Sequence, residues 1–366
     1  MTSPTTMTAV AVRPGERDSL HLTELPVPTA GPGEALVRVR QVGVCGTDQE
    51  IIHGQFGTAP AGAAELVLGH EVLGVVEALG PGTADARVAV GDTVVATVRR
   101  PGGCVPCQAG QSDMCDDLVY TEHGIIGRHG FMAEWFATEA TGLVKVPPAL
   151  AAVGILTEPT SVAEKALQQA ELIQRRIPTW TPRTAIVLGA GPIGLLTTLL
   201  LRSRGIAVVT AARKPAPNRA AGIVETAGAR YVSLRETTLA EVAAGLPPVD
   251  LIVEATGNAD LSFQAMEVLG NNGVLVLLSL TGDEQRREVP ISRVNREFVL
   301  GNKVLVGCVN SNKEHFEMAV ADLARFEEIW PGLLSRLVTR RLHGLADPAR
   351  IAEREADGIK TVIEVG

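Results

Sequence analysis

Three side chains of types that bind metal ions stand in two short motifs of the N-terminal half. Cys45 lies in Gly43-Val-Cys-Gly-Thr-Asp48, and His70 and Glu71 follow Gly69. A thiolate, an imidazole and a carboxylate are ligand types that zinc accepts, and a catalytic zinc keeps room for water or substrate. Taken alone, Cys45 is better explained as a small buried hydrophobic residue and His70 as a hydrogen-bonded core histidine. Together the two motifs form a more specific pattern and indicate a candidate zinc site.

A glycine-rich turn near the middle of the chain has the pattern of a dinucleotide site. The apolar segment 185–188 runs into Gly189, Gly191 and Gly194, and a helical pattern follows at 195–204. The first glycine permits a tight turn, the second lets the backbone approach a pyrophosphate, and the third allows close helix–strand packing. Free N–H groups and the helix dipole then face the phosphates. The strand before the turn and the helix after it favour this interpretation over a chance glycine turn.

The end of the next strand predicts the choice of cofactor. A site that prefers NAD usually places an acid about twenty residues past the first glycine, where it bonds the ribose 2′-hydroxyl. This chain instead reads Thr210-Ala-Ala-Arg213-Lys214. Two cations pair with a 2′-phosphate. We therefore expect NADP to be preferred, with some use of NAD; the alternative is a solvated basic turn.

Composition excludes several classes of protein. The formal net charge is −8 and no run of Lys or Arg occurs, which argues against a nucleic-acid partner. No apolar stretch reaches the roughly 18 residues that span a bilayer, and no export signal is recognisable. The five cysteines are too few and of the wrong parity for a disulfide scaffold. We expect a cytoplasmic protein without a membrane partner.

The elements that must position these residues differ between the two halves. Short strands with Gly and Pro between them, such as 36–40, 72–79 and 93–98, predict a β-barrel-like domain before about residue 150. From about residue 155, strands and helices alternate, which predicts a doubly wound parallel sheet. The fold class is therefore α/β, in two domains.

The chain resembles the medium-chain, zinc-dependent alcohol dehydrogenases, and within them the glucose dehydrogenase branch. The resemblance rests on the motifs above and on Val98-Arg-Arg-Pro101, Gly127-Arg-His-Gly-Phe-Met-Ala-Glu134, Leu156-Thr-Glu-Pro159 and Gly358-Ile-Lys-Thr-Val-Ile363. It implies a GroES-like catalytic domain over 1–157 and 311–366 and a Rossmann domain over 158–310. It also implies a catalytic zinc held by Cys45, His70, Glu71 and Glu158.

The resemblance assigns further roles near the zinc. Thr47 stands where relatives relay the substrate proton, and proton relay or contact with the sugar is favoured over a turn threonine without a role in the site. Glu122, in Tyr120-Thr-Glu-His-Gly-Ile125, matches a glutamate that binds sugar hydroxyls, and Asn310 faces sugar in relatives. Glu158 is expected near substrate as well. The resemblance implies cofactor contacts by Gly189, Gly191, Pro192, Ile193, Gly194, Arg213, Lys214, Leu278, Ser279, Leu280, Cys308, Val309, Asn310 and Lys360.

Three further cysteines lie close together in the sequence. In the wider family a structural zinc uses cysteines spaced C-x2-C-x2-C-x7-C, and Cys104, Cys107 and Cys115 fit its last three positions. Pro101 stands at the first position and cannot be a side-chain ligand. Either an acid or histidine completes a four-coordinate site, or the segment holds no metal; the candidates for the fourth ligand are Asp113, Asp116, Asp117 and His123.

The resemblance implies an oxidoreductase that oxidises an aldose, D-glucose first among them, at C1 and passes the hydride to NADP. A dehydrogenase of another polyol or secondary alcohol is the alternative within enzymes. A nucleotide-binding protein that has lost catalysis is the alternative outside them. Family members commonly form homo-oligomers through the nucleotide domain, so a dimer or tetramer is expected.

Overall fold

The structure, a computed structural model, describes residues 4–281, 286–353 and 355–366 and divides into two compact units. The strand-rich unit comprises the chain up to Ser161, Asn310–Ala324 and Val338–Gly366. The parallel-sheet unit comprises Val162–Val309 and Arg325–Leu337. Segment 325–337 therefore lies with the parallel sheet, whereas the sequence placed it in the catalytic domain. The division falls within two helices, α3 (Thr157–Gln174) and α9 (Lys313–Ile329).

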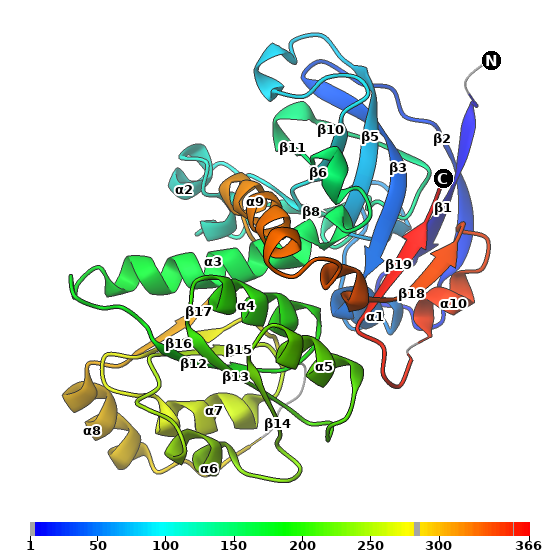
Figure 1. The fold of residues 1–366 in the computed structure, drawn as a ribbon. Helices are drawn as coiled ribbons and strands as arrows, with labels where there is room; N and C mark the ends of the chain where they lie inside the picture. Colours follow the sequence, from blue (N-terminus) through cyan, green and yellow to red (C-terminus); the bar gives the residue numbers. More distant parts are fainter. Residues whose placement is uncertain (1–3, 282–285, 354) are drawn as a thin grey trace. The chain divides into compact units, whose positions relative to one another are not determined.

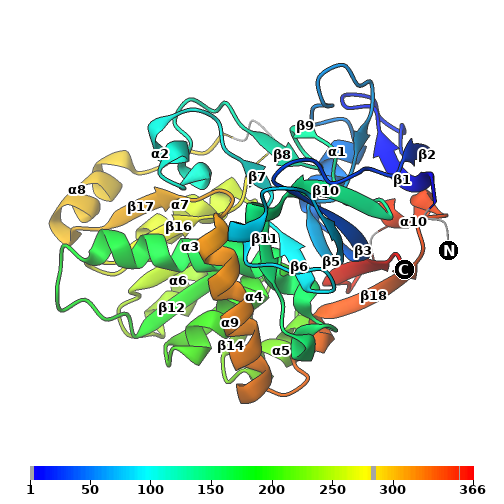
Figure 2. The same ribbon diagram turned by 90° about the horizontal axis from the view of Figure 1, so that it is seen from above.

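The strand-rich unit is built on one long strand, β3 (Glu34–Val44). Its alternation of buried and half-buried residues places Ala35, Val37 and Val39 in the core, as period-two patterning requires. Within the described chain, β3 belongs to a seven-stranded sheet of order β11-β6-β5-β3-β19-β18, in which β10 also pairs with β3. Figures 1 and 2 show β5 and β19 on either side of β3. The C-terminal segment thus returns to this unit, as the sequence predicted.

The remaining elements of the strand-rich unit are short. Two three-stranded sheets have the orders β2-β1-β4 and β7-β8-β9 among the described residues. The strands of the unit are β1 (Thr6–Val12), β2 (His21–Pro26), β4 (Leu66–Val67), β5 (Glu71–Leu79), β6 (Thr93–Ala96), β7 (Arg99–Arg100), β8 (Thr121–His123), β9 (Gly127–Arg128), β10 (Trp135–Glu139), β11 (Leu143–Lys145), β18 (Val338–His343) and β19 (Lys360–Glu364). Its helices are α1 (Gly46–Ile52), α2 (Val105–Gln108) and α10 (Pro348–Ala352), with 3-10 turns at Ala84–Ala86, Ser112–Met114, Ala140–Gly142, Pro148–Leu150 and Gly154–Leu156.

The parallel-sheet unit has six strands in the order β14-β13-β12-β15-β16-β17, and every neighbouring pair is parallel. Numbered along the chain, this order is 3-2-1-4-5-6, the doubly wound arrangement that the sequence predicted. Its strands are β12 (Thr184–Leu188), β13 (Ala207–Ala212), β14 (Arg230–Ser233), β15 (Leu251–Glu254), β16 (Val274–Leu277) and β17 (Val304–Gly307). Its helices are α4 (Pro192–Ser203), α5 (Arg219–Thr226), α6 (Leu239–Ala244), α7 (Ala259–Val268) and α8 (Ile291–Gly301), with a 3-10 turn at Leu334–Leu337.

Both faces of the central part of this sheet are covered, which explains why β12 and β15 are buried along their whole length. Ile186 and Leu188 pack in a buried cluster with Leu239 and Val242 of α6 and Ala265 of α7. Figure 1 shows α6 and α7 on one face and α4 on the other. The topological switch lies between β12 and β15, and the carboxyl ends of all six strands meet at one edge.

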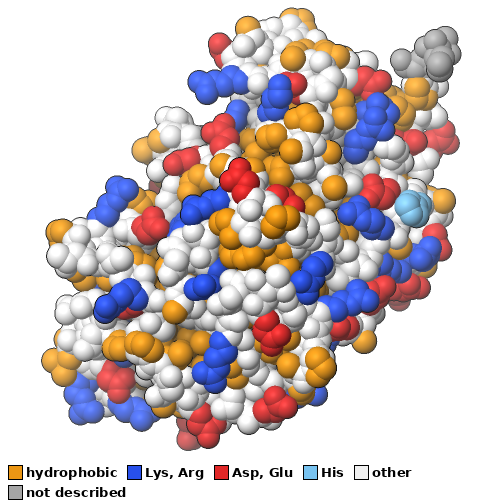
Figure 3. Space-filling view, in the orientation of Figure 1, with side chains coloured by type: hydrophobic (Ala, Val, Ile, Leu, Met, Phe, Trp, Pro, Cys, Tyr) orange, Lys and Arg blue, Asp and Glu red, His pale blue; other side chains and the backbone are white. Residues whose placement is uncertain are grey.

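On the face drawn in Figure 3, basic and acidic side chains are interspersed. No helix among the described residues is both long and apolar enough to cross a membrane.

Candidate active site

Cys45 is held at the point where β3 passes into α1. It is the N-cap of this helix, and its sulfur accepts a hydrogen bond from the backbone N–H of Thr47 at 3.2 Å. Asp48 completes a capping box by accepting from the backbone N–H of Cys45 at 2.8 Å. A cysteine in place of the usual Ser or Thr cap keeps an acceptor at the helix end. The cap therefore fixes the sulfur in place.

His70 brings an imidazole to that sulfur from the next strand. Its Nε2 lies 3.1 Å from the Cys45 sulfur, and its Nδ1 lies 3.6 Å from Oδ1 of Asp48. Gly69 precedes it with φ +87°, and a Cβ there would lie 2.8 Å from the Met132 side chain. Glycine is thus required both for the left-handed backbone and for the space. The resulting turn positions His70 at the start of β5.

Glu71 projects into the same place through a gap left by Gly43. These two residues are register partners in β3 and β5, and a Cβ on Gly43 would lie 2.0 Å from Oε2 of Glu71. Oε1 of Glu71 is ion-paired with the buried ammonium of Lys360, which also donates to the carbonyl of Val44 at 3.1 Å. The glycine two residues before Cys45 is therefore explained by the carboxylate that it accommodates.

The ligand set fits a divalent cation. One ligand atom each of Cys45, His70 and Glu71 lies within 4.8 Å of the other two. Oε2 of Glu71 is buried and has no hydrogen-bond partner among the described residues. A buried carboxylate oxygen without a partner is costly. A cation bound between these three side chains would satisfy that oxygen, and a thiolate, an imidazole and a carboxylate together suit zinc.

The protonation of this group reflects its burial. Removal from water raises the pKa of the Cys45 thiol. For His70 removal from water lowers the pKa, but the negative charges of Cys45 and Asp48 outweigh it and hold the pKa well above the ordinary value. Raised pKa values favour the protonated forms of Cys45 and His70. A cation that binds must displace these protons, as metal binding to thiolate and imidazole generally does.

Glu158 lies near this group but is not one of the three clustered ligands. It is in the first turn of α3, where a carboxylate faces the positive helix end. Removal from water raises its pKa to about 7, His70 opposes the rise, and Glu71 adds to it. Its carboxylate is thus poised to gain or lose a proton near neutral pH. Its role as a fourth zinc ligand stays a prediction.

Lys360 has contacts that the sequence did not suggest. The resemblance implies that this side chain meets a cofactor phosphate, but its ammonium is buried against Glu71 and the Val44 carbonyl. Burial alone would lower the pKa of Lys360, but the charges of Glu71 and Cys45 reverse that effect and raise it. The phosphate contact stays a prediction. The structure adds a role in holding Glu71.

The predicted sugar residues Glu122 and Asn310 come together in the strand-rich unit. The side-chain amide of Asn310 donates to Oε1 of Glu122 at 2.6 Å. Nε of Arg99 donates to the same oxygen at 2.9 Å, and both side chains of this ion pair are buried. Asn310 adopts φ 58°, a left-handed conformation that asparagine tolerates. Arg99 is not among the functional residues predicted from sequence, although it lies in one of the motifs that carry the resemblance.

Asp48 is a second residue near the site for which the sequence predicted no role. It is fully buried, and its Oδ1 and the Nδ1 of His70 both lack hydrogen-bond partners among the described residues. Carboxylates that orient a metal-binding histidine through its second nitrogen occupy this position in zinc sites. Its position three residues after Cys45, within the same motif, is the sequence feature that could have indicated this role.

The predicted dinucleotide residues lie at the carboxyl edge of the parallel sheet. Gly189 follows β12 with φ +107°, and a Cβ on Gly194 would lie 2.1 Å from its carbonyl oxygen. Gly191 is the N-cap of α4, with Pro192 and Ile193 in the first turn. A Cβ on Gly191 would meet no atom within 4 Å. Open space over a glycine at a helix N-terminus is what a pyrophosphate requires.

The other predicted cofactor contacts follow the neighbouring strands. Arg213 and Lys214 come directly after β13 and are exposed. Their backbone carbonyls accept hydrogen bonds from Ser233 at 3.3 Å and from Tyr231 at 2.8 Å, respectively. Segments Leu278–Leu280 and Cys308–Val309 follow β16 and β17. All of these residues of the parallel-sheet unit therefore share one edge.

The cysteine segment forms a second ligand group. The sulfurs of Cys104, Cys107 and Cys115 lie within 4.8 Å of one another. Asp117 contacts them: the Cys115 thiol donates to its Oδ1 at 3.0 Å, and this bond is the main reason that the pKa of Cys115 is raised to about 12. Of the four candidates for a fourth ligand, Asp117 is thus one whose carboxylate contacts a sulfur of the cluster.

The histidine among the other candidates is less suited. Both ring nitrogens of His123 are engaged, Nδ1 with the carbonyl of His129 at 2.8 Å and Nε2 with Thr138 at 3.2 Å. The ring packs 4.5 Å from that of Phe131, centroid to centroid. His123 is therefore a core residue.

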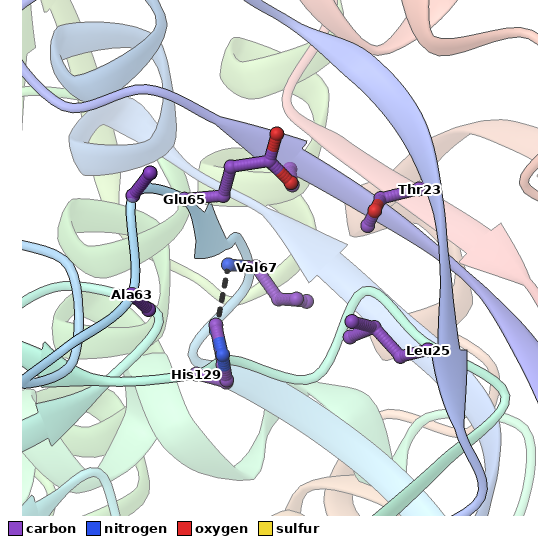
Figure 4. Close-up of a pocket in the computed structure, with 8 residues that line it drawn as sticks. Thr23, Leu25, Ala63, Glu65, Val67 and His129 are labelled. Carbon is purple, nitrogen blue, oxygen red and sulfur yellow. Dashed lines mark hydrogen bonds between the residues drawn. The ribbon is translucent and has the colours of Figure 1, made fainter.

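A separate cavity of about 210 Å³ lies beside the β2-β1-β4 sheet. Figure 4 shows Thr23, Leu25 and Val67 around it, with Nδ1 of His129 accepting from the backbone N–H of Val67 at 3.1 Å. Its lining includes none of the predicted site residues. We assign it no function.

A strand-rich unit with a Cys–His–Glu ligand group and a doubly wound unit with a glycine turn define the class of medium-chain, zinc-type dehydrogenases. Residues 31–148 match the alcohol dehydrogenase GroES-like domain, and residues 151–365 match the glucose dehydrogenase C-terminus. The chain belongs to the glucose dehydrogenase family of this class.

Curated relatives and a solved structure agree with this family. The chain is 42% identical to a glucose 1-dehydrogenase of Methanocella arvoryzae over 98% of this chain and 100% of that protein. It is also 42% identical to a glucose 1-dehydrogenase of Halobacterium salinarum, over 98% of this chain and 99% of the relative. The glucose dehydrogenase of Haloferax mediterranei, solved in complex with NADP, Zn and gluconolactone, matches with a TM-score of 0.89 and 38% identity, over 98% of this chain and 99% of that one.

Proposed function

We propose that this protein is a zinc- and NADP-dependent dehydrogenase that oxidises an aldose, D-glucose first among them, at C1 to the aldonolactone. The observation that carries the proposal is the convergence of Cys45, His70 and Glu71, with an unpartnered carboxylate oxygen among them. The names of the relatives supply the substrate class. The sugar-binding role of Glu122 and Asn310 rests on the family resemblance and on their direct hydrogen bond.

Each side chain of the candidate zinc site has a proposed role. Cys45, His70 and Glu71 would hold the ion, Asp48 would orient His70, and Lys360 would fix Glu71. The chemistry that the bound groups supply is Lewis acidity at the C1 hydroxyl from zinc and hydride acceptance by the nicotinamide. Thr47 is proposed to relay the hydroxyl proton, accepting it at Oγ1 while its own hydroxyl proton passes on to solvent. Glu158, whose pKa is about 7, is the nearby carboxylate able to exchange protons at neutral pH.

The cofactor is proposed to bind at the carboxyl edge of the parallel sheet. The turn at Gly189, Gly191 and Gly194 would receive the pyrophosphate. Arg213 and Lys214 would pair with the 2′-phosphate of NADP, since two exposed cations and no acid follow β13.

A second, structural metal ion is proposed for Cys104, Cys107, Cys115 and Asp117. Four ligands close such a site, and a carboxylate completes the set that Pro101 leaves short by one. Metal analysis of the purified protein should give two zinc ions per chain, and Asp117→Asn should lower that number while Asp116→Asn should not. A ceiling of one zinc per chain in the unaltered protein would refute the structural site.

We also propose that the protein is cytoplasmic, since three of its five cysteines cluster as metal ligands do in a reducing compartment, and that it forms a homo-oligomer through β17. This strand is the edge of the parallel sheet, and Leu305 on it and Val299 and Leu300 on the preceding α8 are exposed by 41%, 67% and 75%. A two-fold axis would pair the edge with its own copy. Sedimentation of Leu300→Glu beside the unaltered chain tests this, and unchanged mass would count against it.

A panel of aldoses and polyols, assayed with NADP and NAD and with and without chelator, tests the main proposal. Turnover of glucose with NADP that is lost on chelation and restored by zinc is expected. Faster turnover of a polyol or secondary alcohol would assign the substrate differently. Nucleotide binding without any zinc-dependent turnover would leave a protein that has lost catalysis.

A further inference from the structure

We propose that Arg99 is a positioning residue for sugar recognition, which fixes Glu122 as a charged acceptor that presents one defined oxygen. The inference rests on the proposed function, in which Glu122 binds hydroxyl groups of the substrate. It adds a residue that lies outside the predicted site, and it specifies how that residue acts.

The contact between the two side chains is built into the backbone. Arg99 of β7 and Glu122 of β8 are register partners in an antiparallel pair, so their side chains leave the sheet side by side. Nε of Arg99 donates to Oε1 of Glu122 at 2.9 Å, and the two side chains are only 3% and 7% exposed. A carboxylate this buried would be costly without a cation. Arg99 supplies the opposite charge beside this carboxylate.

The donors leave one oxygen of the carboxylate for a ligand. Arg99 and Asn310 both donate to Oε1, at 2.9 and 2.6 Å. In the part of the chain that the structure describes, no donor bonds Oε2. Two hydrogen bonds on one oxygen fix the rotation of the carboxylate. Oε2 is thus the acceptor that remains for sugar hydroxyls.

Arg99 is itself held from two further sides. Its Cζ lies 3.7 Å from the centre of the Tyr120 ring, a cation–π contact. Its Nη1 donates to the carbonyl of Ser112 at 3.4 Å, and Ser112 lies in the segment between Cys107 and Cys115. A guanidinium fixed by a ring and a carbonyl has little freedom to follow the carboxylate. Arg99 consequently determines the orientation of the Glu122 carboxylate, and Glu122 does not determine that of Arg99.

Deletion of the guanidinium gives a specific kinetic result. Arg99→Met should raise the KM for the sugar by about tenfold or more, because the buried carboxylate loses its cation and one of the two donors that fix its rotation. The KM for NADP and the zinc content should stay near normal. Arg99→Lys keeps the charge but cannot reproduce the planar donor. Its KM for the sugar should therefore fall between that of the unaltered protein and that of Arg99→Met. Arg128→Met, which breaks another arginine–glutamate pair of the same unit, is the matched control.

Discrimination between glucose and its deoxy analogues is a second measurement, which a purely structural role of Arg99 would not change. The unaltered protein is assayed with glucose and with 2-, 3- and 4-deoxyglucose, and the analogue it rejects most identifies the hydroxyl that Oε2 accepts. Arg99→Met should lose that discrimination, and so should Glu122→Gln. In the double variant, Arg99→Met should add little to Glu122→Gln, because both act through the same oxygen.

The outcomes separate the inference from the function on which it rests. If the unaltered protein oxidises no aldose, the proposed function fails, and the same comparison is made on whichever alcohol it does oxidise. If Arg99→Met and Arg99→Lys leave KM and discrimination unchanged, or if their effects add fully to that of Glu122→Gln, the role of Arg99 is overturned. If Arg99→Met does not fold, the Arg99→Lys series decides by the same criteria.

Discussion

Oδ1 of Asp48 lies 3.6 Å from Nδ1 of His70, on the side of the ring opposite to the Cys45 sulfur. Both of these atoms are buried and lack hydrogen-bond partners among the described residues. A small movement of either would join them, and a cation bound at Nε2 would leave the ring proton on Nδ1, from which it can be donated to the carboxylate. The carboxylate thus stands ready to fix the tautomer of His70 with its proton on Nδ1.

Asp48→Asn should weaken the catalytic metal by about 10- to 100-fold, since loss of a carboxylate behind a metal-binding histidine has that effect. The amide oxygen of asparagine can still accept from the backbone N–H of Cys45, so the cap of α1 survives. Competition with a chromophoric chelator measures the affinity. Unaltered zinc affinity together with normal turnover would remove Asp48 from the site.

Gly43→Ala should displace Glu71, because the new methyl carbon would lie 2.0 Å from its Oε2. A displacement of about 1 Å in such a site can cost as much as 100-fold in rate, so we expect kcat/KM to fall at least about tenfold, with loss of zinc. Gly46→Ala, three residues on, meets no atom within 4 Å and is the control. Equal activity of the two variants would show that the carboxylate does not occupy this place in solution.

Arg213→Ala and Lys214→Ala should each raise the KM for NADP by roughly tenfold while changing that for NAD little, because a hydrogen bond to a charged group contributes about 1.5–3 kcal/mol. Arg230→Ala is a suitable control, since this exposed residue begins β14 and so lies at the amino ends of the strands, opposite the proposed cofactor site. Steady-state kinetics of each variant with NADP and with NAD measure this difference in KM. A matched loss with NAD and NADP would indicate a general role for these cations instead.

Acid should destabilise the strand-rich unit in two steps. Burial and the charges of Arg100 and Arg128 hold the pKa of His123 well below its usual value, despite opposing contributions from the His129 carbonyl and Glu139. A depressed histidine pKa gives stability that is complete above about pH 6.5 and is lost as the pH falls below it. The free energy of unfolding then decreases by up to about 1.4 kcal/mol for each pH unit.

The second step concerns Glu139. Partial burial would raise the pKa of this carboxyl, but the charge of Arg100 and backbone hydrogen bonding outweigh it and lower the pKa to about 2. Its stabilising contribution is complete above about pH 4.5 and disappears as the pH approaches 2. Since this side chain is 43% exposed, solvent screening makes the contribution small. Thermal unfolding from about pH 7.5 to 3 should show both steps; His123→Asn should remove the first, and the exposed His343→Asn should not.

Much of this protein is readable from local sequence. The strand–turn–helix at 184–203 follows from an apolar run and three glycines, and the alternation of strands and helices predicts the doubly wound sheet that the structure has. Local sequence also identifies Cys45, His70 and Glu71, because their motifs are contiguous. What local sequence determines is the type of each element and the chemistry that it carries.

Tertiary structure alone decided which distant side chains share charges and hydrogen bonds. Lys360 meets Glu71 because β19 pairs with β3, and Arg99 meets Glu122 because β7 and β8 are in register. Periodicity and propensity act over a few residues, whereas strand pairing joins residues up to 323 positions apart, as for Glu364 of β19 and Gln41 of β3, so no local pattern could have specified these contacts.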